Sequence, residues 1–402
     1  MNHLAELLPA LPASFNILTT FGALLAAGII GARLFVRTLR LPILSAWVLT
    51  GFILGPAALG LVNQAQLTDL QPLVEIGLAL ILFQLGRRLD VGWLLRERWL
   101  AMTSLAIAMT LFAAVAVALG AVGLSVTTSL LIAALTLAVS PATLLLTIRE
   151  LRAEGVVSER ALNQTALIHL LGWLALGLTL AGWQAHSQPL TASLLSLLAR
   201  SVAALLLGLF SAWLAVRLAD WLGKLDGYQP VILVALVTVT MGICSWLGWP
   251  AAVSLLVFGS ATRRMDRQFA LAEPDLLPYG RLLYVALFVL AGAALEPRAL
   301  AVAWLPAVVV LVVRLAVPVA MMVLLARPNG VDYRQGVAIG ATLWPVAGAP
   351  LIGIGMVGQF NPVLASQLAA ISLSILLLSE LLGPIVIRQA LRVCKEHGEN
   401  TR

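Results

Sequence analysis

The chain alternates between long apolar segments and short polar connections. Apolar segments of about bilayer-crossing length fall at residues 15–36, 41–61, 71–86, 99–120, 126–148, 161–183, 191–219, 230–247, 250–262, 279–295, 300–326, 334–357 and 363–390. The pattern predicts an all-α polytopic membrane protein with about 13 transmembrane helices.

Basic residues collect in alternate connections. Nearly all Lys and Arg follow the odd-numbered segments, and the other connections contain only Arg298. Because cytoplasmic loops carry the excess of basic residues, we expect an outside N-terminus and a cytoplasmic C-terminus in the inner (plasma) membrane. The composition agrees, since 61% of residues are hydrophobic and 11% charged, whereas soluble domains are about 25% charged.

Other functional classes have little support in the sequence. The formal charge of +7 resides at segment ends and is explained by topology, so we expect no nucleic-acid partner. The sequence contains no phosphate-binding loop, no metal-ligand cluster and no soluble-enzyme constellation. We therefore expect a protein that is not an enzyme and uses neither a cofactor nor a metal centre.

Two apolar segments are interrupted at corresponding places in the two halves of the chain. The interrupting and flanking residues are Ser140, Pro141 and Thr143 in the first, and Trp344, Pro345, Gly348 and Pro350 in the second. Proline removes a backbone donor and clashes with the preceding turn. Paired interruptions are typical of inverted-repeat transporters, whose site lies between the two breaks. We expect unwinding at residues 140–143 and 344–350, with the two breaks crossing near mid-membrane.

Three stretches, Gly51–Val62, Glu75–Asp90 and Tyr284–Leu300, are similar to motifs of the monovalent cation:proton antiporters of the bacterial sodium/proton exchanger and potassium-efflux type. The resemblance implies one transmembrane domain over residues 1–402, without a soluble regulatory domain. In that family a scaffold often forms the interface of a homodimer, and the resemblance assigns this role to residues 1–98 and 230–295 here. A linker helix (191–219) joins the scaffold to a mobile core (99–183 and 300–390) that contains the broken helices.

The resemblance also reveals a departure from the family pattern. Family members place a carboxylate on the sixth segment, and the matching stretch here is Ile168–Gly172. His169 stands where the family has Gln or Asn, and Leu170 where it has Asp. The segment around Pro345 also lacks the family's acid, whereas Arg314 matches a buried basic residue of the family.

Glu380 is the obvious replacement acid. His169 lies 28 residues after Pro141, and 28 residues after Pro345 is Leu373. Glu380 is seven residues beyond Leu373, or about 10 Å along a helix, so we expect it to line an inner vestibule more easily than the central site. His169 is either a neutral side chain bonded to a carbonyl or a proton carrier.

The sequence thus favours a secondary antiporter that exchanges protons for Na⁺ or K⁺ by alternating access within a lipid bilayer. Its candidate site comprises Ser140, Thr143, His169 and Glu380 with backbone carbonyls at both breaks. One alternative is a proton-coupled or uncoupled transporter of an anion or organic solute, which Arg314 would bind. Another is a membrane scaffold or sensor that has kept the fold without transport.

Overall fold

The computed structural model describes residues 16–89, 97–184, 189–222, 228–266, 277–295, 297–347, 354, 357–358 and 361–396. Its named elements are helices: α1 Ile17–Thr38, α2 Ile43–Leu54, α3 Gln64–Arg88, α5 Arg98–Ala121, α6 Val126–Leu137, α7 Pro141–Leu151, α8 Val156–Gln184, α9 Leu190–Leu222, α10 Gln229–Leu247, α11 Ala251–Met265, α12 Leu277–Ala293, α13 Pro297–Leu324, α14 Tyr333–Thr342 and α16 Pro362–Val393. Eight of the helices described are long and apolar enough to cross a membrane. The all-helical membrane class is therefore confirmed, whereas the number of crossings stays a prediction.

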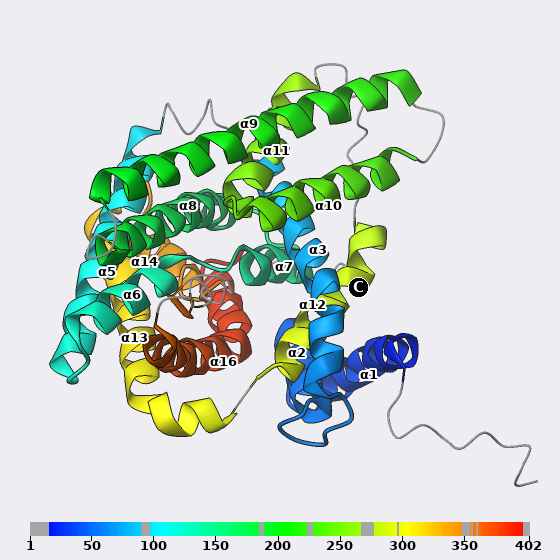
Figure 1. Ribbon diagram of the computed structural model, residues 1–402, viewed down its shortest axis with the longest axis horizontal. Coiled ribbons are helices and arrows are strands. Elements are labelled where there is room, and N and C mark those ends of the chain that lie inside the picture. Colours follow the sequence, from blue (N-terminus) through cyan, green and yellow to red (C-terminus); the bar gives the residue numbers. More distant parts are fainter. Residues whose placement is uncertain are drawn as a thin grey trace, which may run out of the picture.

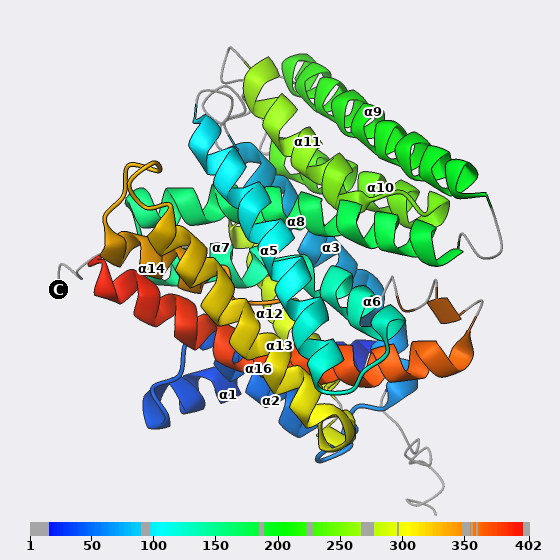
Figure 2. The same ribbon diagram turned by 90° about the vertical axis from the view of Figure 1, so that its left-hand side faces the viewer.

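The helices form two groups in Figure 1. On one side, α2 packs against α1 and α12, and α12 packs against α3. On the other, α13 packs against α5, α14 and α16, and α6 packs against α5 and α8. The long helix α9 lies along α11, and both lie together with α10 at the top of Figures 1 and 2.

Glycine allows the closest helix contact in the first group. Gly51 of α2 lies against the backbone of Val289 and Ala293, and Gly292 of α12 lies against the backbone of Val48. A Cβ atom at either glycine would collide with main-chain atoms of the facing helix. Small residues at such interfaces let membrane helices approach closely and gain van der Waals contact.

The first predicted break is real but lies slightly earlier than expected. Helix α6 ends at Leu137, and α7 resumes at Pro141. Thr143 is thus already helical, because proline is well tolerated at the first helical position, where its missing N–H would have no partner. Ser140 caps α7, its side chain accepting from the Thr143 N–H.

The second break follows α14, which ends at Thr342. Residues 343–347 are non-helical, so Trp344 and Pro345 lie in an interruption as predicted. Gly348 and Pro350 lie outside the residues that the structure describes.

Candidate functional site

The two breaks meet and pair as a short antiparallel bridge between Val139 and Val346. The Ser140 N–H donates to the Pro345 carbonyl at 2.9 Å, and the Ala347 N–H donates to the Ala138 carbonyl at 3.0 Å. Non-helical backbone at membrane depth must find partners inside the protein. The predicted crossing is thus present, and each break satisfies part of the other's backbone.

Arg314 on α13 holds the same crossing together. Its side chain is fully buried. Its Nε donates to the carbonyl of Trp344 at 3.1 Å, and its Nη2 to those of Leu343 and Pro345 at 3.2 Å each. Its Nη1 donates to the carbonyl of Thr136, at the end of α6.

The four carbonyls that bind Arg314 lie at or just beyond the C-terminal ends of α6 and α14. A helix C-terminus carries partial negative charge, equivalent to about half an electron. Arg314 therefore finds its balancing charge in the two interrupted helices. Trp344 adds a second tie, because its Nε1–H donates to the Leu311 carbonyl of α13 at 2.8 Å.

His169 on α8 also binds a break. Its Nδ1 lies 2.9 Å from the Val139 carbonyl oxygen. Because a carbonyl can only accept, Nδ1 carries the proton in this bond, which leaves Nε2 as the other ring nitrogen for further chemistry. One turn further on, a Cβ atom at Gly172 would lie 2.8 Å from the Ala138 backbone nitrogen, so α8 approaches the break closely.

Ser140 and Thr143 are buried beside the crossing. Their hydroxyl oxygens lie 2.9 Å apart and share a hydrogen bond. Both residues lie at the start of α7, where Ser140 is the N-cap. The structure brings these two candidates together. Leu170, in contrast, packs against the large hydrophobic core.

Near Glu380, helix α16 contacts the second break and the start of α7. The Val346 N–H donates to Ser379 Oγ at 2.8 Å. A Cβ atom at Gly383 would lie 3.0 Å from Pro345 Cγ and 3.4 Å from Thr143 Cγ2. Glu380 is therefore adjacent to the crossing.

The sequence places Glu380 two turns beyond the level of His169, whereas the contacts of Ser379 and Gly383 place it beside the second break. An offset between the two repeats accounts for about one of these turns. His169 reaches a partner 30 residues earlier, whereas Ser379 reaches one 33 residues earlier. Three residues amount to nearly one helical turn. A fixed offset of 28 residues therefore does not transfer from the first half to the second.

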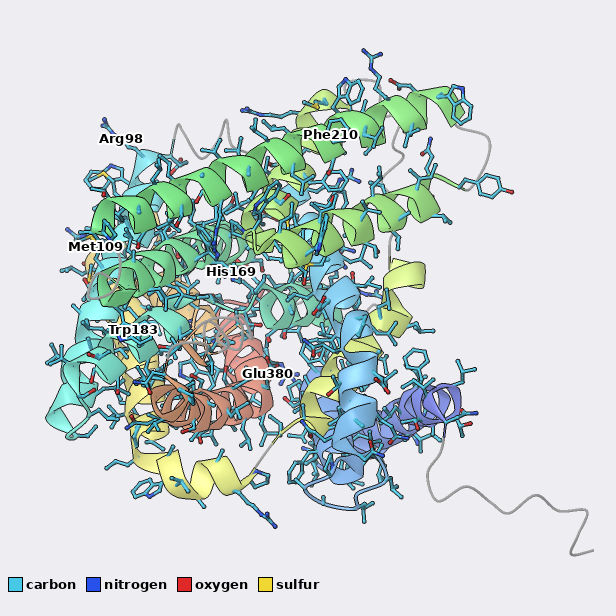
Figure 3. The ribbon with its side chains drawn as sticks, viewed as in Figure 1. Arg98, Met109, His169, Trp183, Phe210 and Glu380 are labelled. Atoms are coloured by element: carbon cyan, nitrogen blue, oxygen red, sulfur yellow. The ribbon has the colours of Figure 1, made fainter. Side chains whose placement is uncertain are left out.

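Glu380 has a buried carboxyl oxygen, Oε2, with no hydrogen-bond partner in the part of the chain described. The residue as a whole is only half-buried. Figure 3 shows Glu380 on α16 and His169 on α8, both toward the middle of the molecule.

Three polar residues in succession on α8, Asn163, Gln164 and Thr165, did not figure among the predicted site residues. Gln164 and Thr165 are fully buried, and Asn163 is nearly so. Gln164 Nε2 lies 3.2 Å from Met322 Sδ of α13, while Gln164 Oε1 and Thr165 Oγ1 are buried without a partner among the described residues. The signal in the sequence was a run of three polar residues inside an apolar segment. Burying polar groups costs free energy unless they are hydrogen-bonded or serve the function.

Comparisons with known proteins agree with this architecture. The family model described as "Sodium/hydrogen exchanger, transmembrane" matches residues 23–393. Two structures of the sodium proton antiporter MjNhaP1 from Methanocaldococcus jannaschii are similar in fold. The one at pH 8 has a TM-score of 0.64 at 17% identity, covering 95% of this chain and 99% of that one. The second, an electron-microscopy structure, has a TM-score of 0.65 at 18% identity, covering 96% and 100%. A comparison with curated proteins gives no match.

Proposed function

The chain belongs to the sodium/hydrogen exchanger family, a family of cation:proton antiporters, and we propose that it exchanges protons for Na⁺ or K⁺ at the crossing of its two broken helices. The observation that carries this proposal is the paired backbone at Val139 and Val346. Such discontinuous helices place carbonyl groups and helix ends at one point inside the membrane, where coupling ions bind in transporters of this architecture.

The groups around the crossing suit a cation better than an anion. Hard cations prefer oxygen ligands, and Ser140, Thr143 and Glu380 offer side-chain oxygens at or beside the crossing. Arg314, the obvious anion ligand, is already engaged by four carbonyls. This engagement favours exchange of cations over the alternative of an anion or organic-solute transporter.

Alternating access requires two bodies that move against each other. We propose residues 99–183 and 300–390 as the mobile core, residues 1–98 and 230–295 as the scaffold and homodimer interface, and residues 191–219 as the linker. Several polar contacts tie these bodies at their arginine-rich ends, including the ion pairs of Arg88 with Glu159 at 3.9 Å and of Arg160 with Glu97 at 3.7 Å. Two further contacts involve the start of α2 and the connection before it. The Ile43 N–H donates to Glu150 Oε1 at 3.0 Å, and Arg388 Nη1 donates to the Arg40 carbonyl at 3.2 Å.

The Glu150 contact caps the first turn of α2, which has no cap from the side chain of its N-cap residue, and the Arg388 contact binds the connection before it. Movement of the mobile core would have to break them. We place the arginine-rich ends at the cytoplasmic face, with the C-terminus inside and the N-terminus outside, in the inner membrane.

The test is transport by the purified protein in liposomes loaded with a pH-sensitive dye. After a pH gradient is imposed, Li⁺, Na⁺, K⁺ and Rb⁺ are added in turn, followed by a panel of anions. We expect at least one monovalent cation to drive proton movement and no anion to do so. Proton movement driven by an anion alone, or by no ion in the panel, would contradict the proposal.

A further inference from the structure

Exchange needs a group that holds either a proton or a cation, and the sequence restricts the choice. Five acidic residues lie within the proposed mobile core. Glu150, Glu154, Glu159 and Asp332 lie at or near helix ends, outside the apolar segments. Of these five, Glu380 alone lies inside an apolar segment, 19 residues into the 32-residue helix α16.

The neighbours of Glu380 place it where the mobile core meets both the breaks and the scaffold. Ser379, one residue earlier, binds the second break through the Val346 N–H. Leu381, one residue later, has its carbonyl bound by Ser45 Oγ of α2 at 2.9 Å. Gly383, one turn later and on the same face as Glu380, packs on the second break and on the start of α7. Protonation or cation binding at Glu380 would therefore occur next to residues that contact the second break and the scaffold.

Glu380 also offers its main-chain carbonyl oxygen in addition to the two oxygens of its side chain. Residue 384 is a proline inside α16. Proline has no N–H, so the main-chain carbonyl of Glu380 receives no hydrogen bond from the residue four positions later. A carboxyl group and a released carbonyl on one residue make a set of hard oxygen donors, which suits a proton or a small monovalent cation.

No residue that the structure describes forms an ion pair that would neutralise the charge of Glu380. The guanidinium of Arg314 donates four hydrogen bonds to carbonyls of the broken helices. Glu380 Oε2 is buried without a hydrogen-bond partner among the described residues. An isolated carboxylate away from water is costly. The group must therefore be neutralised by a proton or by a bound cation.

We infer that Glu380 is the exchange carboxyl of this protein, taking the place of the acid missing from the sixth segment. The inference rests on the proposed function. As a cation binds the carboxyl oxygens, the O–H bond breaks and the proton leaves to water on that side of the membrane. On the other side a proton returns and the cation leaves. Each cycle moves one cation one way and one proton the other, with no net charge moved.

The transport test compares three variants in the liposome assay with the cation that drives the wild-type protein. Glu380→Gln keeps the size of the side chain but cannot titrate, whereas Glu380→Asp keeps the carboxyl. Glu75→Gln is the matched control, because Glu75 is a half-buried acid inside an apolar segment, on α3 of the proposed scaffold. We expect exchange by Glu380→Gln to fall to the level of protein-free liposomes, with Glu380→Asp and Glu75→Gln still active.

A second measurement uses the wild-type protein and does not depend on the folding of a variant. Dicyclohexylcarbodiimide modifies protonated carboxyl groups in apolar surroundings, and mass spectrometry locates the modified residue. We expect modification at Glu380 that falls as the transported cation is added and as the pH is raised.

Cation-driven exchange by Glu380→Gln at the wild-type rate, or modification of Glu380 that ignores the cation, would overturn the inference while leaving the proposed function intact. Wild-type protein that moves no protons with any cation would instead overturn the proposed function itself.

Discussion

Replacing Arg314 with Met tests whether the crossing depends on its buried charge. The guanidinium donates four hydrogen bonds to carbonyls of two interrupted helices. Hydrogen bonds to charged groups contribute about 1.5–3 kcal/mol each, so four give an upper range of roughly 6–12 kcal/mol. Because the helix ends relax and water enters, we expect a loss of at least about 3 kcal/mol, the lower end for breaking a buried charged contact.

The assay is thermal unfolding of the purified protein in detergent, followed by tryptophan fluorescence. Arg200→Met is the matched control, since Arg200 lies in an apolar helix but is exposed, and exposed substitutions usually change stability by less than about 0.5 kcal/mol. Arg314→Lys should recover part of the stability, because lysine keeps the charge but has three donors and no planar fork. Equal melting temperatures for Arg314→Met and the wild-type protein would refute the reasoning.

Three further substitutions probe the contacts around the site. His169→Gln should keep exchange with an unchanged pH profile in liposomes, because its amide N–H can still donate to Val139 and Glu380 carries the proton; a loss of proton coupling would make the imidazole the carrier. Gly383→Val should lower the melting temperature by the equivalent of about 1–3 kcal/mol and slow exchange by pushing α16 away from Pro345 and the start of α7, whereas Gly242→Val, with nothing within 4 Å of its Cβ position, should do neither. Glu396→Gln should cost about 0.5–2 kcal/mol in the same melting assay, because the carboxylate accepts from Val157 N at 2.7 Å and from the Ser158 N–H and hydroxyl at 2.8 Å each, at the start of α8; an unchanged melting temperature would show that this cap is dispensable.

The sequence predicted the features that depend on local chemistry. Apolar length identified the helices, and the prolines at 141 and 345 marked both interruptions, because each removes a backbone donor at a fixed place. Arg314 was found because it matches a buried basic residue of the family that the sequence resembles.

The features that depend on tertiary contacts were not predictable in the same way. Whether Arg314 binds an anion or carbonyls is decided by the ends of α6 and α14, which lie far from it in sequence. The position of Glu380 relative to the second break depends on how α16 packs against that break, which the apolar pattern of the helix does not encode. The polar residues around Gln164 were visible in the sequence, but only burial showed that their oxygens lack partners.

The central claim is that a proton and a cation compete for Glu380. The most direct measurement is the number of protons released per cation bound, obtained by calorimetric titration of the wild-type protein in buffers of different ionisation enthalpy. At a pH where the carboxyl is protonated, we predict close to one proton released per cation bound by the wild-type protein, and no proton release by Glu380→Gln. Cation binding by the wild-type protein at that pH without proton release would contradict the account.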